Sequence, residues 1–269
     1  MHPFRTQAQR LYRSAIPLRR RIQRSLMTGW LTALAVFLSL VSANAQSRRR
    51  KSVSSVPAYT RGNSWALFSE YAPTSSHILW GVSEKRLRLA FGGEYARRLV
   101  RGHGLEFDCM VQAKPVSLES DPTLVGFRSV STGQIVARVV EPPRVVLVNN
   151  SPFFLTNVGQ VTPVYGREWT YGFELDPIGL KLNFRARQRL QPFIDATGGF
   201  IVTPRDIPID ETSNFNYEFG FGSGFDYFLS TRHSLRFGYA FRHISNNGLG
   251  IYNPGIDAGV IEVGYSFGR

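Results

Sequence analysis

Cysteine is almost absent from this chain of 269 residues, because Cys109 is the only one. A single cysteine excludes an intrachain disulfide and a cluster of thiolate metal ligands. No other group of metal ligands stands out in the sequence, so neither a metal nor a cofactor is expected. Helical periodicity is also missing after Ala45, which predicts that the body of the chain is not helical.

Acidic residues are missing from the first 45 positions, which carry seven arginines. An apolar run follows from about Trp30 to Val41, and the segment ends in Ala43-Asn44-Ala45. A basic start, a short apolar run and an A-x-A site predict a signal peptide over residues 1–45. The run is shorter than the roughly 20 apolar residues that span a bilayer. The alternative to a cleaved signal peptide is that this segment stays attached as a membrane anchor.

The positive charge of the chain is concentrated near its start. Without the seven arginines of the predicted signal, 25 basic residues stand against 19 acidic ones. Four of these basic residues lie at positions 48–51, in a basic tail predicted for residues 46–63. The remaining body is nearly balanced in charge, so the sequence makes no case for a nucleic-acid partner.

Aromatic residues, by contrast, are abundant and regularly spaced, with 20 phenylalanines and 11 tyrosines. From Phe215 to Tyr227 aromatic side chains face one way, while small and charged ones face the other. A period of two predicts a strand with one apolar face. Segments of this kind are predicted at residues 64–83, 86–99, 104–117, 168–185, 189–203, 214–230, 233–246 and 257–268.

Eight strands, an export signal and aromatics at strand ends favour an all-β, eight-stranded antiparallel transmembrane β-barrel over residues 64–269, in an outer membrane. A soluble lipocalin-like barrel or a β-sandwich is the alternative. Residues from about 118 to 167 are predicted to form one long extracellular insertion with short β pieces of its own. A change of apolar parity around Asp176-Pro177 predicts a bulge.

The apolar face of the strand at 233–246 ends in two polar residues, His243 and Ser245. Their Cα atoms are expected to lie roughly 6.5 to 7 Å apart, within reach of each other's side chains. Serine needs an adjacent base to become a nucleophile, and that base needs an acceptor to orient it. Asp257, on the next strand, shares their outward parity, whereas Glu262 has the parity of the lumen. The pattern predicts a catalytic triad of Ser245, His243 and Asp257.

Acyl transfer also needs hydrogen-bond donors for the oxyanion. The backbone N–H of Gly248 and the side-chain amide of Asn253 are the candidates in the loop that follows. The alternative interpretation of the whole pattern is a polar pair at the membrane interface without a chemical role.

The motif His243-Ile244-Ser245-Asn246, followed by Asn253 and Asp257, resembles the lipid A 3-O-deacylases of the PagL type, also described as acyloxyacyl hydrolase-like proteins. The resemblance implies Ser245 as nucleophile, His243 as base and Asp257 as acid, with Gly248 and Asn253 in the oxyanion hole and Asn246 in support. Better-known members of that family carry glutamate at the acid position, and the insertion at 118–167 is not part of their minimal barrel.

The activity implied by the resemblance is that of an outer-membrane serine esterase, which removes an ester-linked acyl chain from the lipid A of lipopolysaccharide. Its partners are then lipopolysaccharide and outer-membrane lipids, and a homodimer is left open. A non-enzymatic barrel for adhesion or envelope integrity is the main alternative, with the insertion as its functional part. A soluble lipid-binding barrel is the third.

Overall fold

The structure is a computed structural model that describes residues 58–269, except 103, 153–154 and 156–158. The predicted signal peptide, and all but the last few residues of the predicted tail, lie outside the described residues. Among the described residues, we find no helix with the length and hydropathy of a membrane span.

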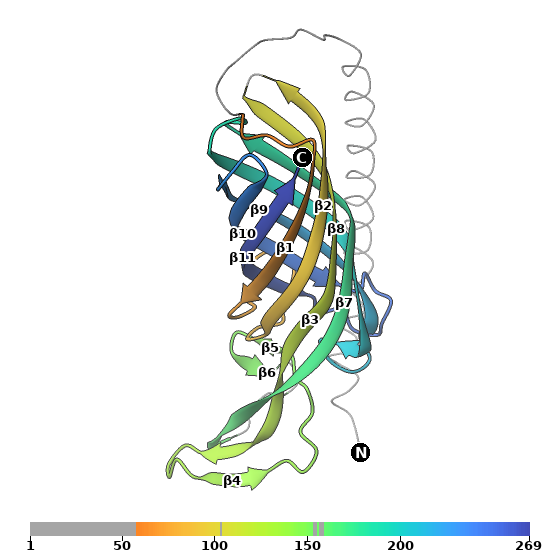
Figure 1. The fold of residues 1–269 in the computed structure, drawn as a ribbon. Coiled ribbons are helices and arrows are strands. Elements are labelled where there is room, and N and C mark those ends of the chain that lie inside the picture. The colour runs from red at the N-terminus through yellow and green to blue at the C-terminus, as the bar shows by residue number, and fades with distance from the viewer. Residues whose placement is uncertain (1–57, 103, 153–154, 156–158) are drawn as a thin grey trace. The chain divides into compact units, whose positions relative to one another are not determined.

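Eight antiparallel strands form a closed ring (Figure 1). Their order around the ring is β1, β2, β3, β7, β8, β9, β10 and β11, and the pairing of β11 with β1 closes it. This confirms the predicted eight-stranded all-β barrel. The bounds of the ring strands are β1 Asn63–Ala72, β2 Leu87–Gly102, β3 Leu105–Ser129, β7 Val161–Phe184, β8 Leu190–Ile207, β9 Ser213–Phe228, β10 His233–Ser245 and β11 Ile256–Gly268.

Alternation along each strand separates an apolar exterior from a charged interior, as predicted. In β10, Phe237 and Tyr239 are 40% and 59% exposed on the outside, while Arg236 and Arg242 are buried on the inside. Successive side chains of a strand point to opposite faces, so this pattern continues around the whole ring. An apolar outer band with a polar lumen is the pattern of barrels that lie in lipid.

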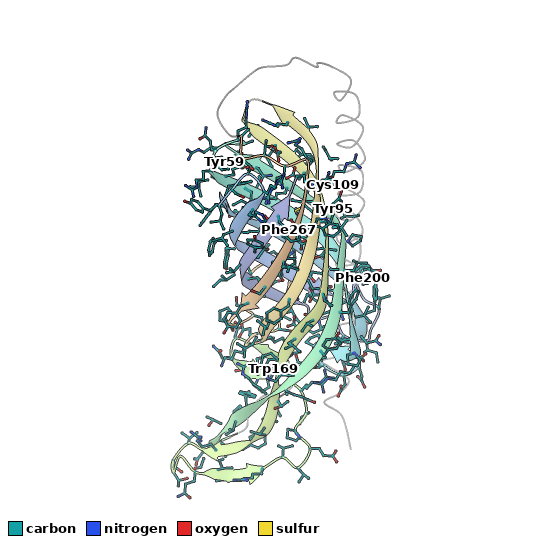
Figure 2. All side chains as sticks on the ribbon, viewed as in Figure 1. Tyr59, Tyr95, Cys109, Trp169, Phe200 and Phe267 are labelled. Atoms are coloured by element: carbon teal, nitrogen blue, oxygen red, sulfur yellow. The ribbon has the colours of Figure 1, made fainter. Side chains whose placement is uncertain are left out.

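Aromatic side chains mark both ends of the barrel. Figure 2 shows Tyr95 and Phe267 toward the end that holds the C-terminus, and Trp169 toward the opposite end. At the first end the rings of Trp65 and Tyr95 lie 4.8 Å apart between centroids. Girdles of aromatic residues at two levels are typical of barrels that meet a membrane interface on each side.

The end opposite the C-terminus, which we call the loop end, carries the long connections. There β3 and β7 continue past the other strands as a two-stranded extension, joined at its edge by β4 (Ile135–Arg138) (Figure 1). The short strands β5 (Leu147–Val148) and β6 (Ser151–Pro152) pair with each other.

Much of the predicted insertion at 118–167 is therefore strand, because the β3–β7 pairing runs on to Ser129 and Val161. Sequence alternation does not reveal this extension, because Glu119, Ser120 and Asp121 are consecutive and all buried. The bulge predicted near Asp176-Pro177 is confirmed by a shift of register between Leu175 and Ile178.

The first predicted strand, 64–83, was wrong in its second half, because β1 ends at Ala72. Pro73 follows directly, and proline has no N–H to donate to a strand ladder. Residues 73–86 instead form a loop, not the short connection expected near Ser83. The loop lies along the start of β11 through bridges from Ser75 to Ala258 and from Ser83 to Ile256.

Candidate active site

His243 and Asp257 form the best-defined pair at the loop end. They are opposite each other in the pairing of β10 with β11, and His243 Nδ1 lies 2.6 Å from Asp257 Oδ1. Because an ionised carboxylate only accepts hydrogen bonds, Nδ1 of the imidazole carries the proton. Nε2 of the neutral ring is then the unprotonated nitrogen, which is the form that a general base requires.

The carboxylate of Asp257 is itself held by backbone donors. Its Oδ2 accepts hydrogen bonds from the N–H groups of Leu79 at 2.7 Å and Trp80 at 2.8 Å. Both donors belong to the 73–86 loop, which brings them over the start of β11. Asp257 is fully buried beneath this loop. The carboxylate is therefore oriented from two sides, by the imidazole and by the loop backbone.

A close approach at Gly81 makes this arrangement possible. A Cβ atom at this position would lie 2.5 Å from the backbone nitrogen of Asp257 and 2.8 Å from its Oδ1. No side chain fits in that space, so glycine is required where the loop crosses the strand. Side-chain alternation did not predict this contribution, because residues 64–83 were expected to form one strand.

The indole of Trp80 covers the imidazole from outside the barrel. Its ring meets that of His243 edge-on, with centroids 5.4 Å apart. The centroid of the indole also lies 6.2 Å from that of Phe219 on β9 and 6.1 Å from that of Phe241 on β10, the strand of His243 itself. The side chain of His243 is left 15% exposed. The imidazole thus lies in an aromatic surrounding on the apolar exterior, where its orientation is fixed by packing as well as by Asp257.

Ser245 follows two residues later on the same face and contacts Asn253. Its Oγ donates to Asn253 Oδ1 at 3.1 Å, and the same oxygen accepts the backbone N–H of Asn246 at 3.2 Å. A backbone N–H can only donate, so this second contact fixes which side-chain atom of Asn253 is the oxygen. Ser245 is buried, with 8% of its surface exposed.

Asn246 shapes the loop that carries the predicted oxyanion donors. Its Nδ2 donates to the carbonyl of Tyr252 at 2.7 Å, and its Oδ1 accepts the N–H of Gly248 at 2.8 Å. Gly248 has a positive φ of 83°, which favours glycine. The structure therefore brings Asn246, Gly248 and Asn253 together beside Ser245, with the Gly248 N–H engaged by Asn246.

Glu262 lies in the lumen, as its parity predicted, with its Oε1 3.5 Å from Arg236 Nη1. It is thus separated from the pair at His243 by the wall of the barrel. In the part of the chain that the structure describes, no three His, Cys, Asp or Glu side chains are placed to hold a metal ion.

The fold and the site together define a class: a small β-barrel with an apolar exterior, and a Ser, His and Asp constellation at the rim of that exterior. Comparison with known families gives the more particular result. The family model described as lipid A 3-O-deacylase (PagL) matches residues 149–266. This match contains all the candidate site residues and confirms the resemblance drawn from the motif at 243–257. With the apolar exterior, it assigns the barrel to the cell outer membrane.

The solved structures that match this chain include two that are titled as outer-membrane proteins. One is titled the outer membrane enzyme PagL, with 13% identity, 76% of this chain and 99% of that chain covered, and a TM-score of 0.45. Another is the outer membrane protein OprG from Pseudomonas aeruginosa, with 11% identity, coverage of 79% and 98%, and a TM-score of 0.41. No curated protein matches the chain.

Proposed function

We propose that this protein is an outer-membrane serine esterase that removes an ester-linked acyl chain from lipid A. One observation carries the proposal: a His243–Asp257 pair, backed by loop amides, lies on the lipid-facing side of the wall, two residues from Ser245. Polar groups facing hydrocarbon cost free energy, so an ordered set of them indicates a function. The family match supports lipid A as the substrate.

In the proposed reaction, the hydroxyl of Ser245 turns from Asn253 Oδ1, to which it donates in this structure, toward His243 Nε2. Ser245 Oγ then attacks the ester carbonyl while its proton passes to that nitrogen. Asp257 stabilises the imidazolium that forms. The imidazolium then gives the proton to the leaving alkoxide, which departs as an alcohol and leaves an acyl-serine. Water, deprotonated by the same nitrogen, attacks the acyl-serine and releases a fatty acid together with the free hydroxyl of Ser245.

The oxyanion donors in this proposal are the side-chain N–H of Asn253 and the backbone N–H of Gly248. Asn253 Oδ1 accepts the hydrogen bond from the Asn246 N–H, so the NH₂ group of Asn253 takes no part in that contact. This NH₂ group is the donor proposed for the oxyanion. The Gly248 N–H leaves Asn246 Oδ1 when substrate enters. Asn246 keeps its supporting role through the carbonyl of Tyr252.

The test is mass spectrometry of lipid A from membranes with and without the expressed protein. We expect the loss of one acyl chain in its presence, and none with the S245A variant. The matched control is S223A, which removes an exposed serine of β9 outside the site. Unchanged lipid A with the parent protein favours the non-enzymatic barrel. Equal deacylation by S245A and S223A contradicts the serine mechanism.

A further inference from the structure

One segment of the insertion, residues 143–150, contacts the loop that holds Asp257. We call this segment the strap. The carbonyl of Leu147 accepts the N–H of Glu84 at 2.9 Å, and Glu84 Oε2 accepts the N–H of Asn150 at 2.9 Å. Arg86 adds a bond from Nη2 to the carbonyl of Val145 at 3.1 Å. These contacts fix the end of the same 73–86 loop whose amides orient the carboxylate.

The strap also contacts the end of β8 and the connection that follows it, between β8 and β9. Arg144 Nη1 donates to the carbonyl of Asp206 at 2.6 Å, and its Nη2 forms an ion pair with Asp210. The side chain of Arg144 is only 5% exposed. The guanidinium is held by a carbonyl and by the carboxylate of Asp210, whose own side chain is 85% exposed, so the attachment depends on the two contacts together.

This second connection is attached to the loop of the proposed nucleophile. The carbonyl of Glu211, one residue beyond Asp210, accepts the N–H groups of Ile251 at 2.8 Å and Tyr252 at 3.2 Å. Tyr252 is in turn the residue whose carbonyl binds Asn246. The strap thus reaches both sides of the site, through Glu84 and Arg86 on one side and through Arg144 on the other.

The strap itself rests on the β3 extension. The N–H of Val145 donates to the carbonyl of Pro122, and the N–H of Leu124 donates to the carbonyl of Pro143, both at 2.9 Å. Val146 and Leu147 are buried. Loops are the parts of a protein that open most readily, so two loops that must keep one geometry gain from a common support.

We propose that the strap is a positioning element of the site. It sets the separation between the loop that orients the His243–Asp257 pair and the loop that carries Ser245. The inference rests on the proposed esterase function and gives the insertion a role within it. A displacement of about 1 Å between reacting groups lowers the rate by about 100-fold, so a support of this kind acts on kcat more than on KM.

Substitution of Arg144 tests the strap at one attachment, and E84A tests it at the other. For R144M we expect kcat for lipid A deacylation to fall at least tenfold, with KM within twofold, and R144K to recover part of the loss. The matched control is R138M, which removes an exposed arginine of β4 in the same insertion. Values of kcat for R144M and E84A within twofold of R138M, in folded protein, overturn the proposal.

A second readout does not require activity. Nitroxide labels on cysteines at the exposed positions Ile78 and Leu249, in a C109S background, report the separation of the two loops by EPR. We expect a distance distribution at least twofold broader in R144M than in R138M. Equal widths overturn the strap proposal even if the parent is an active esterase. A broader distribution in R144M, together with no deacylation by the parent protein, supports the strap and rejects the esterase.

Discussion

The lumen and the outer rim of this barrel use the same kinds of side chain in opposite ways. In the lumen a charge can be shared among several partners: Lys114 Nζ lies 2.9 Å from Glu174, 3.0 Å from Glu218, 3.3 Å from Asp176 and 3.4 Å from Glu70. At the rim, the Nδ1 of His243 contacts one carboxylate oxygen of Asp257 at 2.6 Å. Shared contacts hold strands together, whereas single directed contacts fix a tautomer.

This difference indicates where function is to be sought in such a barrel. Most buried charges among the described residues lie in the lumen, where contacts with one another account for them as part of the packed interior. The polar side chains on the apolar exterior do not pack the lumen, so their presence needs another explanation. If this comparison is correct, substitutions at the rim change the reaction rate and substitutions in the lumen change the stability.

The largest effect is expected from H243A, which removes the proposed base. We expect kcat to fall by about 1,000-fold or more, since an unassisted serine hydroxyl is a poor nucleophile. The matched control is H233A on the same strand, whose imidazole contacts Tyr265 at the other end of the barrel. Deacylation rates measured on purified lipopolysaccharide separate the two. A loss with H233A as large as with H243A contradicts the assignment.

A somewhat smaller loss is expected for D257N, about 100- to 1,000-fold in kcat, because the amide can donate to Nδ1 and so stabilise the wrong tautomer of His243. Lumenal Glu262 provides the comparison. E262Q is expected to keep kcat within twofold, since its partner is Arg236 and not the imidazole. Similar kcat values for the two variants break the distinction between rim and lumen.

The loop over Asp257 is tested by G81A. The added Cβ would lie 2.5 Å from Asp257 N, so the loop must move away and loosen its two amide contacts. We expect kcat to fall by about 10- to 100-fold. G198A on β8 is the control, because a Cβ there meets no atom within 4 Å. Equal rates for G81A and G198A show that the loop does not matter to the site.

The smallest effect on rate, and the largest on stability, is expected for K114M. Removal of one partner from a buried charged cluster leaves uncompensated carboxylates and costs about 3 to 5 kcal/mol. Urea unfolding in detergent measures that loss, with R97M at an exposed arginine as the control. The folded fraction is expected to keep kcat within twofold. A large loss of kcat without loss of stability reverses the comparison.

The sequence was sufficient for the parts of the structure that depend on side-chain parity. Alternation along 233–246 predicted His243 on the exterior, and the same rule selected Asp257 over Glu262. The eight-strand ring followed from the same periodicity. These predictions succeed because each strand has one apolar and one polar face, which a period of two reports directly.

Parity could not predict what backbone groups and loops contribute. The donors to Asp257 are the backbone N–H groups of Leu79 and Trp80. Every residue except proline has such a group, so the residue types do not indicate which ones donate to a side chain. Gly81 was the one visible signal, because an isolated glycine can indicate a close backbone approach. The β3 extension was missed because three consecutive buried residues, Glu119 to Asp121, have no period.

The most direct measurement is covalent labelling with a fluorophosphonate, followed by mass spectrometry of the peptides. The account predicts one modified residue, Ser245, with labelling absent in S245A and at least tenfold slower in H243A than in H233A. Labelling of another serine, or equal rates in H243A and H233A, contradicts the claim that this rim of the barrel holds an activated nucleophile.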